Sequence, residues 1–184
     1  MIGAMGLRPG THTVGPDSGT LRVNTYREGM AQKVGHDLII DVGQWQAKVE
    51  VDEGGTPSVI TLEADPRSLH VREGQRGVKP LTDRDRAEIR SNIDEKILRG
   101  EPIAFSSSVV QPADSRLTVQ GELTIAGTTR PTSFQLDLSG DGRVSGSLSV
   151  TQSEWGIKPY RAFMGALKVR DSVEVVLDAT LPTS

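Results

Sequence analysis

The three histidines are the residues of this sequence best suited to proton transfer or metal binding near neutral pH. His12, His36 and His70 lie far apart and form no H-x-H or H-E-x-x-H pair. A metal site needs several imidazole or carboxylate groups that converge on one point, so no metal site is predicted. The chain also has no cysteine, which excludes disulfide bonds, thiolate catalysis and cysteine-based zinc sites.

His36 is followed directly by Asp37, and such a pair can supply a general base and the carboxylate that orients it. A hydrolase of this kind would also need a nucleophile, and no serine lies in the G-x-S-x-G turn typical of esterases. We therefore predict that the protein is not an enzyme. His36 is expected at the end of a strand, where it could meet the polar head of a ligand. A hydrolase or isomerase that uses His36 and Asp37 is the alternative.

Aromatic residues and methionine are the candidates for contact with an apolar ligand. One short segment holds Trp155, Tyr160, Phe163 and Met164. This segment predicts either a flexible apolar flap over a cavity or the ordinary cover of one end of a core, and both alternatives stay open. Trp45 is expected in the core more than against a ligand.

Composition excludes several other partners. The net charge is -3, and lysine and arginine are spread along the chain, whereas nucleic-acid binding needs a concentrated basic face. Aromatic residues make up only 4% of the chain, too few for a platform on which bases stack. The opening residues, MIGAMGLRPGTHTV, contain no apolar stretch of the length that secretory signals have. We expect a cytoplasmic protein with no nucleic-acid partner and at most transient contact with a membrane.

Most of the chain is predicted to form short strands. Apolar and polar residues alternate over 44–52 and again over 173–181, and a period of two is typical of half-buried strands. Glycine-rich turns follow several of these segments. The expected strands are 20–27, 44–52, 59–64, 103–110, 117–125, 134–138, 144–150 and 173–181.

One helix is expected between the strands, over 83–98. Thr82 and Asp85 have the spacing of a capping box, and Ile89, Ile93 and Ile97 form one apolar stripe. Gly100 and Pro102 end it. Many strands in up-and-down order with a single helix predict one domain, 1–184, whose residues 10–181 form a closed or nearly closed antiparallel barrel.

Four segments resemble the YceI-like family. Residues 121–131 (GELTIAGTTRP) are similar to the family pattern G-x-L-T-I-x-G-x-T-[KR]-P, and residues 102–107 (PIAFSS) are similar to its P-x-[IA]-x-F-x-S strand. Residues 10–16 resemble the family's first strand. Residues 152–157 (QSEWGI) stand where the family has R-x-x-[FW]-G, with Gln152 in place of arginine.

This resemblance implies an all-β fold, an extended eight-stranded antiparallel lipocalin-like barrel with the helix packed against it. Family members bind polyisoprenoid chains, such as those of quinones, inside the barrel, so binding, storage or transport of such a ligand is expected, with no further cofactor. A homodimer is also expected from the family. An interaction module whose barrel is filled by its own side chains is a further alternative. The predicted ligand contacts are His36, Trp45, Phe105, Phe134, Leu148, Trp155, Tyr160, Phe163 and Met164.

Overall fold

The computed structural model describes residues 5–162, 165 and 167–184. In this part of the chain eleven strands form one antiparallel sheet, in the order β1-β5-β6-β8-β9-β10-β11-β14-β2-β4-β7. Its strands are β1 (Gly10–Val14), β2 (Gly19–Thr25), β4 (Asp37–Val42), β5 (Trp45–Val51), β6 (Pro57–Ala64), β7 (Leu69–Gln75), β8 (Ile103–Ala113), β9 (Arg116–Ile125), β10 (Thr128–Leu138), β11 (Arg143–Thr151) and β14 (Ser172–Thr180).

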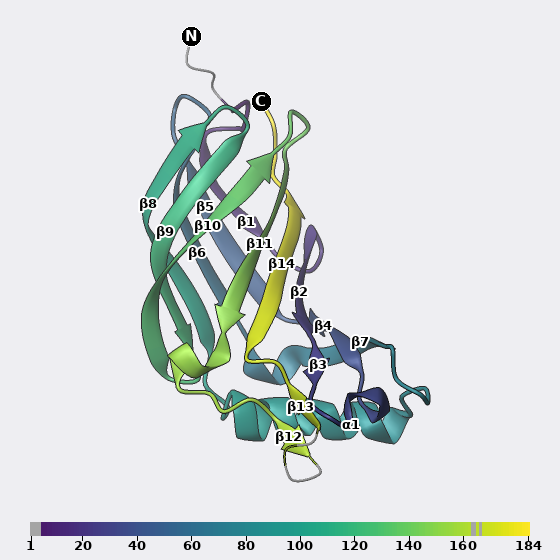
Figure 1. Ribbon diagram of the computed structural model, residues 1–184. Helices are drawn as coiled ribbons and strands as arrows, with labels where there is room; N and C mark the ends of the chain where they lie inside the picture. The colour runs from purple at the N-terminus through teal and green to yellow at the C-terminus, as the bar shows by residue number, and fades with distance from the viewer. Residues whose placement is uncertain (1–4, 163–164, 166) are drawn as a thin grey trace.

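Three lengths of chain contribute two strands each to this sheet. They are interrupted at residues 15–18, 43–44 and 65–68, between β1 and β2, β4 and β5, and β6 and β7. Each interruption contains glycine or proline, and glycine weakens a strand while proline cannot donate a ladder hydrogen bond. The strands β1, β5 and β6 lie at one edge of the sheet, and their continuations β2, β4 and β7 lie at the opposite edge. The sheet therefore curls round on itself into a barrel (Figure 1).

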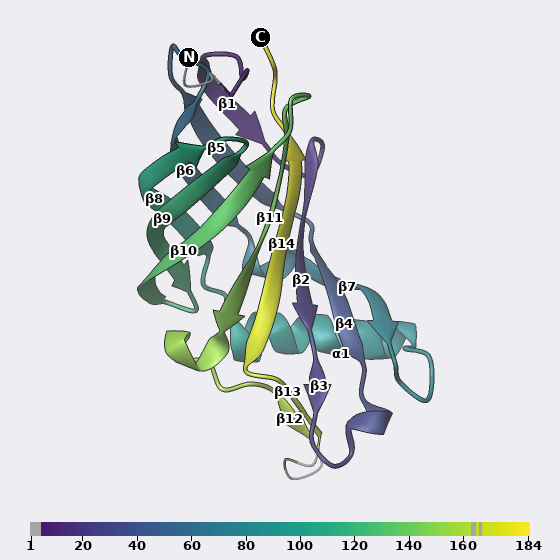
Figure 2. The ribbon, with the colours of Figure 1, turned by 45° about the horizontal axis from the view of Figure 1, so that its top comes forward.

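The all-β class and the antiparallel, lipocalin-like barrel are thus confirmed. Eight lengths of chain form the wall, as expected, but eight is wrong as a count of hydrogen-bonded strands because three of those lengths are broken. Beyond the breaks, β7 diverges from the wall: it pairs with β4, while β6 pairs with β8. Figure 2 shows β4 and β7 splayed to one side of the barrel axis.

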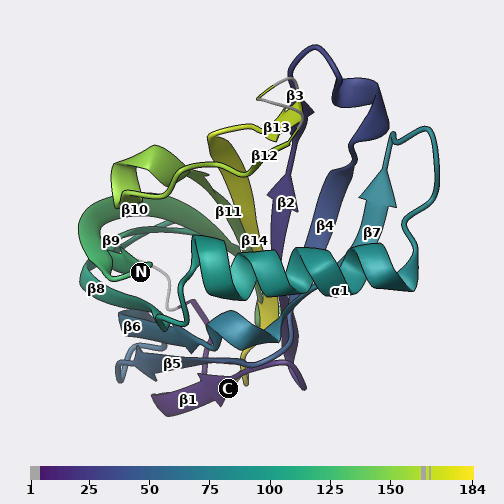
Figure 3. The ribbon, with the colours of Figure 1, turned by 90° about the horizontal axis from the view of Figure 1, so that it is seen from below.

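The helix lies across the end of the barrel that this divergence opens (Figure 3). The capping box at Thr82 and Asp85 is formed, and α1 spans Asp83–Asn92. The expected continuous helix over 83–98 is corrected in its last part, because Ile93–Ile97 forms a π-helical turn, η3, in which the Leu98 amide donates to the Ile93 carbonyl oxygen. The described chain also forms the 3-10 turns η1 (Gln32–Val34), η2 (Pro66–Ser68) and η4 (Gln152–Trp155).

A small second sheet continues the wall beside the helix. Its order is β12-β13-β3, with strands Arg161–Ala162, Leu167–Val169 and Arg27–Glu28. Phe163 and Met164 lie between the first two of these strands and outside the described residues.

The opposite end of the barrel is covered by the two ends of the described chain. The Leu7 amide donates to the Gly55 carbonyl oxygen, and Leu7 also forms a bridge with Thr183. Leu7 is completely buried and Leu181 nearly so. The chain therefore closes one end of the barrel and leaves the end under α1 as the way in.

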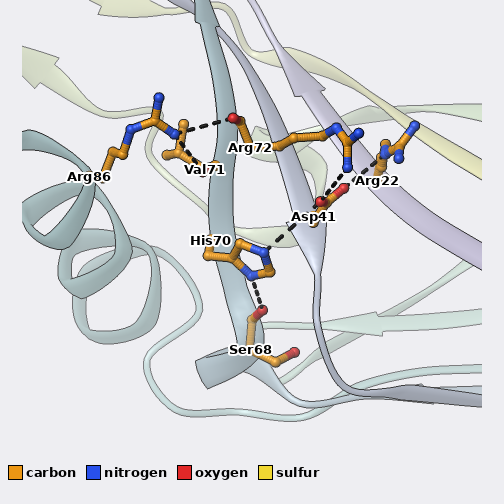
Figure 4. Close-up of polar contacts among 7 residues, drawn as sticks. All are labelled: Arg22, Asp41, Ser68, His70, Val71, Arg72 and Arg86. Carbon is orange, nitrogen blue, oxygen red and sulfur yellow. Dashed lines mark hydrogen bonds and ion pairs between the residues drawn. The ribbon is translucent and has the colours of Figure 1, made fainter. Parts of the chain in front are cut away.

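A charged cluster outside the barrel holds the divergent strands together (Figure 4). Asp41 on β4 accepts hydrogen bonds from Arg22 on β2, at 2.8 Å, and from Arg72 on β7, at 3.3 Å. Arg86 of α1 donates to the Val71 carbonyl oxygen at 2.9 Å, which fixes the helix to β7. Burial acts to raise the pKa of the Asp41 carboxyl, but the hydrogen bonds and charges of Arg22 and Arg72 outweigh it and hold that pKa below its ordinary value.

We expect Asp41→Asn to lower the free energy of unfolding at pH 7 by about 1–2 kcal/mol, because both arginines lose a charged acceptor. A carboxyl whose folded-state pKa lies below the unfolded value, about 3.9, adds stability above that value and loses it as pH falls through the folded pKa. The difference between wild type and variant should therefore shrink below about pH 4. Urea unfolding across pH measures it. An equal loss in Asp137→Asn, which removes a solvent-exposed ion pair with Arg116, would contradict this.

Gly121 of β9 lies under the ring of Phe105. A Cβ at this position would be 2.2 Å from the Ser106 carbonyl oxygen and 2.8 Å from the Phe105 ring. Gly121→Ala is therefore expected to lower the free energy of unfolding by about 1–3 kcal/mol through overpacking. Gly140→Ala is the matched control, since nothing lies within 4 Å of its Cβ. Urea midpoints compare the two, and an unchanged midpoint for Gly121→Ala would overturn the prediction.

Candidate functional site

The barrel encloses an elongated cavity of about 630 Å³. Side chains that alternate along the strands supply its wall: in β5, for example, Ala47 and Val49 face inward while Gln46, Lys48 and Glu50 are exposed. The deep part is lined almost wholly by aliphatic and aromatic residues. Among them are Val14, Leu21, Ile40, Val49, Ile60, Leu62, Phe105, Leu117, Leu123, Phe134, Leu136, Val144, Leu148, Val150, Leu177 and Leu181.

The apolar stripe of the helix faces this cavity. Ile89, Ile93 and Ile97 all contribute to its lining, so α1 and η3 form a lid of fixed structure over the open end. Two rings inside the wall, Phe105 and Phe134, pack in a tilted pair with centroids 5.2 Å apart. Strands therefore form the side wall of the cavity, and α1 with η3 covers part of one end.

Polar lining residues gather where the helix meets the loops. His36, Lys79, Asp85, Glu88 and Tyr160 all line this end of the cavity. Val34 and Tyr160 are also exposed to solvent, so they mark its entrance. The site thus has a polar, solvent-accessible end and an apolar, closed end.

His36 is fixed by its surroundings. Its Nε2 lies 2.6 Å from the Lys79 carbonyl oxygen, and its ring packs on Gly77, where a Cβ would be 2.1 Å from Nε2. Asp37 lies on the other side of the chain, where one carboxylate oxygen accepts the Arg27 amide at 2.8 Å. The two neighbours therefore do not form the hydrogen-bonded base and orienting acid that the enzyme alternative requires.

A second arrangement resembles a catalytic triad only by residue type. Asp41, His70 and Ser68 are neighbours (Figure 4), but His70 Nδ1 faces the Ser68 carbonyl oxygen, at 3.2 Å, and not its hydroxyl. The Ser68 hydroxyl donates to the Asp65 carbonyl oxygen at 2.7 Å. This geometry has no nucleophile beside a base.

Five of the nine predicted ligand contacts line the cavity: His36, Phe105, Phe134, Leu148 and Tyr160. Two further predicted contacts, Phe163 and Met164, fall outside the described residues.

The two tryptophans are buried elsewhere. Trp45 lies beside Ala64 and Pro102 at a small surface depression. The Trp155 indole donates to the Leu123 carbonyl oxygen at 2.9 Å, which joins η4 to β9 of the wall. Neither side chain belongs to the cavity lining.

Gln152 is a lining residue that the predicted contacts did not include. It is buried, and its side-chain amide donates to the Arg170 carbonyl oxygen at 3.0 Å. A neutral amide here leaves this part of the wall without a charge. Apart from Leu148, the predicted contacts do not include the aliphatic lining residues, because their only signal is the period of two, which every half-buried strand shares.

Across residues 5–162, 165 and 167–184, no group of three histidine, aspartate or glutamate side chains is placed to hold a metal ion. Nor does any helix in the described chain have the length and apolar character needed to cross a bilayer.

An antiparallel barrel around an apolar cavity with one polar entrance is the arrangement of lipocalin-like binding proteins. A sequence model of the YceI-like domain matches residues 22–181. A search of curated proteins gave no match. The chain belongs to the YceI-like family.

Solved structures share the fold. BcnA of Burkholderia cenocepacia superposes with a TM-score of 0.64 and 15% identity, covering 87% of this chain and 94% of that one. The YceI protein of Campylobacter jejuni gives a TM-score of 0.59 and 10% identity, covering 79% of this chain and 84% of that one.

A charge placed inside the cavity should block an apolar ligand. Leu148→Lys is expected to weaken uptake of an apolar fluorescent probe at least about tenfold, because an uncompensated charge in an apolar site is costly. Glu122→Lys changes an exposed residue of β9 and should leave uptake unchanged. Probe titration, with circular dichroism to check folding, compares them. Equal effects of the two variants would rule out an internal site.

Proposed function

We propose that this protein binds a long apolar molecule, such as a polyisoprenoid chain or the tail of an isoprenoid quinone, inside its barrel. The observation that carries the proposal is the cavity of about 630 Å³ with its aliphatic lining. Ligand sites typically enclose about 300–1,000 Å³ and are mostly apolar with a few placed polar groups. Membership of the YceI-like family also supports a binding role.

Binding of a long apolar chain in such a site does not require specific hydrogen bonds. Each CH₂ group removed from water contributes about 0.8 kcal/mol, so a long chain gains affinity along its whole length, offset by the cost of ordering it. The tilted rings of Phe105 and Phe134 add aromatic surface to the aliphatic lining. The neutral side chain of Gln152 adds no charge to the cavity lining.

The distribution of polar residues supports one orientation for the ligand. The closed end near Leu117 and Leu181 offers only apolar contacts, whereas His36, Lys79 and Tyr160 stand at the entrance. A molecule with one polar end would bury its tail first and leave its head beside these residues.

The other sequence-based alternatives receive less support. His36 and Asp37 are not paired, and an interior filled by its own side chains would not enclose a cavity of this volume. Storage or transport of the ligand stays a prediction. So do the cytoplasmic location and the homodimer.

Native mass spectrometry of the purified protein, followed by solvent extraction and lipid analysis, tests the proposal. We expect one apolar ligand per chain, or uptake of one when the apo protein is offered isoprenoid alcohols or quinones. A protein that is isolated without ligand and takes up none of these would contradict it.

A further inference from the structure

The entrance of the cavity is surrounded by exposed apolar side chains. Met30 is 98% exposed and Val78 is 67% exposed, and Val34 and Tyr160 are exposed beside them. These four residues come from three separate loops that meet at the helix end of the barrel (Figure 3). Isolated exposed apolar residues are ordinary, but most of the large exposed ones in the described chain gather at this entrance, and such clustering marks an interaction surface.

Contacts between the loops show that these residues share one surface. The Val78 amide donates to the Lys33 carbonyl oxygen at 3.2 Å, which places the loop of residues 76–80 beside η1. Val34, Lys79 and Tyr160 also line the cavity. The apolar residues therefore form a rim around the opening through which a ligand must pass.

The same loops and the adjoining strand β12 carry positive charge. Lys33, Lys79, Lys158 and Arg161 are all exposed, and among the described residues none of them has a carboxylate within ion-pair distance. A local cationic surface stands out on a chain whose net charge is -3.

The acidic groups nearest these cations are either paired with other basic residues or carried by α1, where Asp85 and Glu88 line the same end of the cavity and offset part of the positive charge. Glu28 is paired with Lys168 and Arg170, and Asp37 lies 3.6 Å from the Arg76 guanidinium. Asp83, Asp85 and Glu88 belong to α1, where the Asp85 carboxylate accepts the Thr82 amide. The rim loops themselves thus present cations between apolar tips.

We propose that this rim docks on the surface of an anionic phospholipid bilayer, so that the apolar ligand passes directly between membrane and cavity. The proposal rests on the proposed ligand binding. Protruding apolar tips can enter the boundary between headgroups and acyl chains, while lysines interact with anionic headgroups. Methionine and valine tips on separate loops, spaced by lysines, suit a fluid surface of negative charge better than the single apolar groove that a peptide would need.

Vesicle flotation tests the docking. The full chain is mixed with vesicles of phosphatidylcholine alone or of phosphatidylcholine with phosphatidylglycerol. We expect binding to the anionic vesicles only, weakening as salt is raised because exposed charges are screened. Equal binding to both vesicle types, or none to either at low salt, would overturn the proposal.

Variants locate the surface. Lys33→Glu with Lys158→Glu should reduce partition to anionic vesicles at least about tenfold, since each basic residue near such a surface contributes roughly fivefold. Met30→Ser with Val78→Ser should reduce it severalfold. None of these four residues lines the cavity. Controls on the barrel wall, Lys48→Glu with Arg130→Glu and Val59→Ser with Val109→Ser, should bind as wild type does. Equal losses in the control pairs would contradict a local docking surface.

A second readout separates docking from ligand binding. Each variant is offered farnesol in solution, without vesicles, and uptake is measured by native mass spectrometry. If rim variants lose vesicle binding but retain uptake, both proposals stand. If the wild type takes up ligand but does not bind anionic vesicles, docking is overturned alone. If it binds vesicles through the rim but takes up no ligand, ligand binding fails while the docking surface remains.

Discussion

The ladder of backbone hydrogen bonds around the barrel is the interaction on which the rest of the structure depends. An α-helical core is held by the packing of its side chains and has to be filled, whereas a curled sheet is held by its own backbone. The interior of this protein can therefore stay partly empty without collapse. Apolar residues on the inner faces of β5, β9 and β11 then serve two purposes, since they stabilise the wall and leave an apolar surface for a ligand.

The interruptions of three wall segments decide where the cavity opens. Because the ladder is interrupted at residues 15–18, 43–44 and 65–68, β4 and β7 can turn outward and leave room for α1. Arg86 and Asp41 then hold helix and strands in place from outside. The positions of the entrance, the polar residues around it and the exposed rim all follow from a local loss of strand pairing.

The sequence predicts the fold better than it predicts the site. The alternation in β5 and the capping box at Thr82 are local patterns, and the structure contains both. The breaks were missed because a glycine or proline does not reveal whether a strand resumes after it. Trp45 lies in the core, which the sequence favours over contact with a ligand. Trp155 is also buried outside the cavity, because the burial of a large aromatic residue does not distinguish a cavity from a packed wall. Phe105, Phe134 and Leu148 line the cavity because their strands curve around it.

The closed end of the barrel has a consequence for the molecules that fit. Leu7 and the residues after β14 seal that end, so a guest and the water it displaces must use the same opening in opposite directions. For the proposed ligand, the tail would then enter first and leave last, and a molecule with bulky groups at both ends would not pass through the opening. The depth of the cavity also limits the length of the ligand that fits best. A longer chain would leave carbon atoms in water, and a shorter one would leave part of the cavity unfilled.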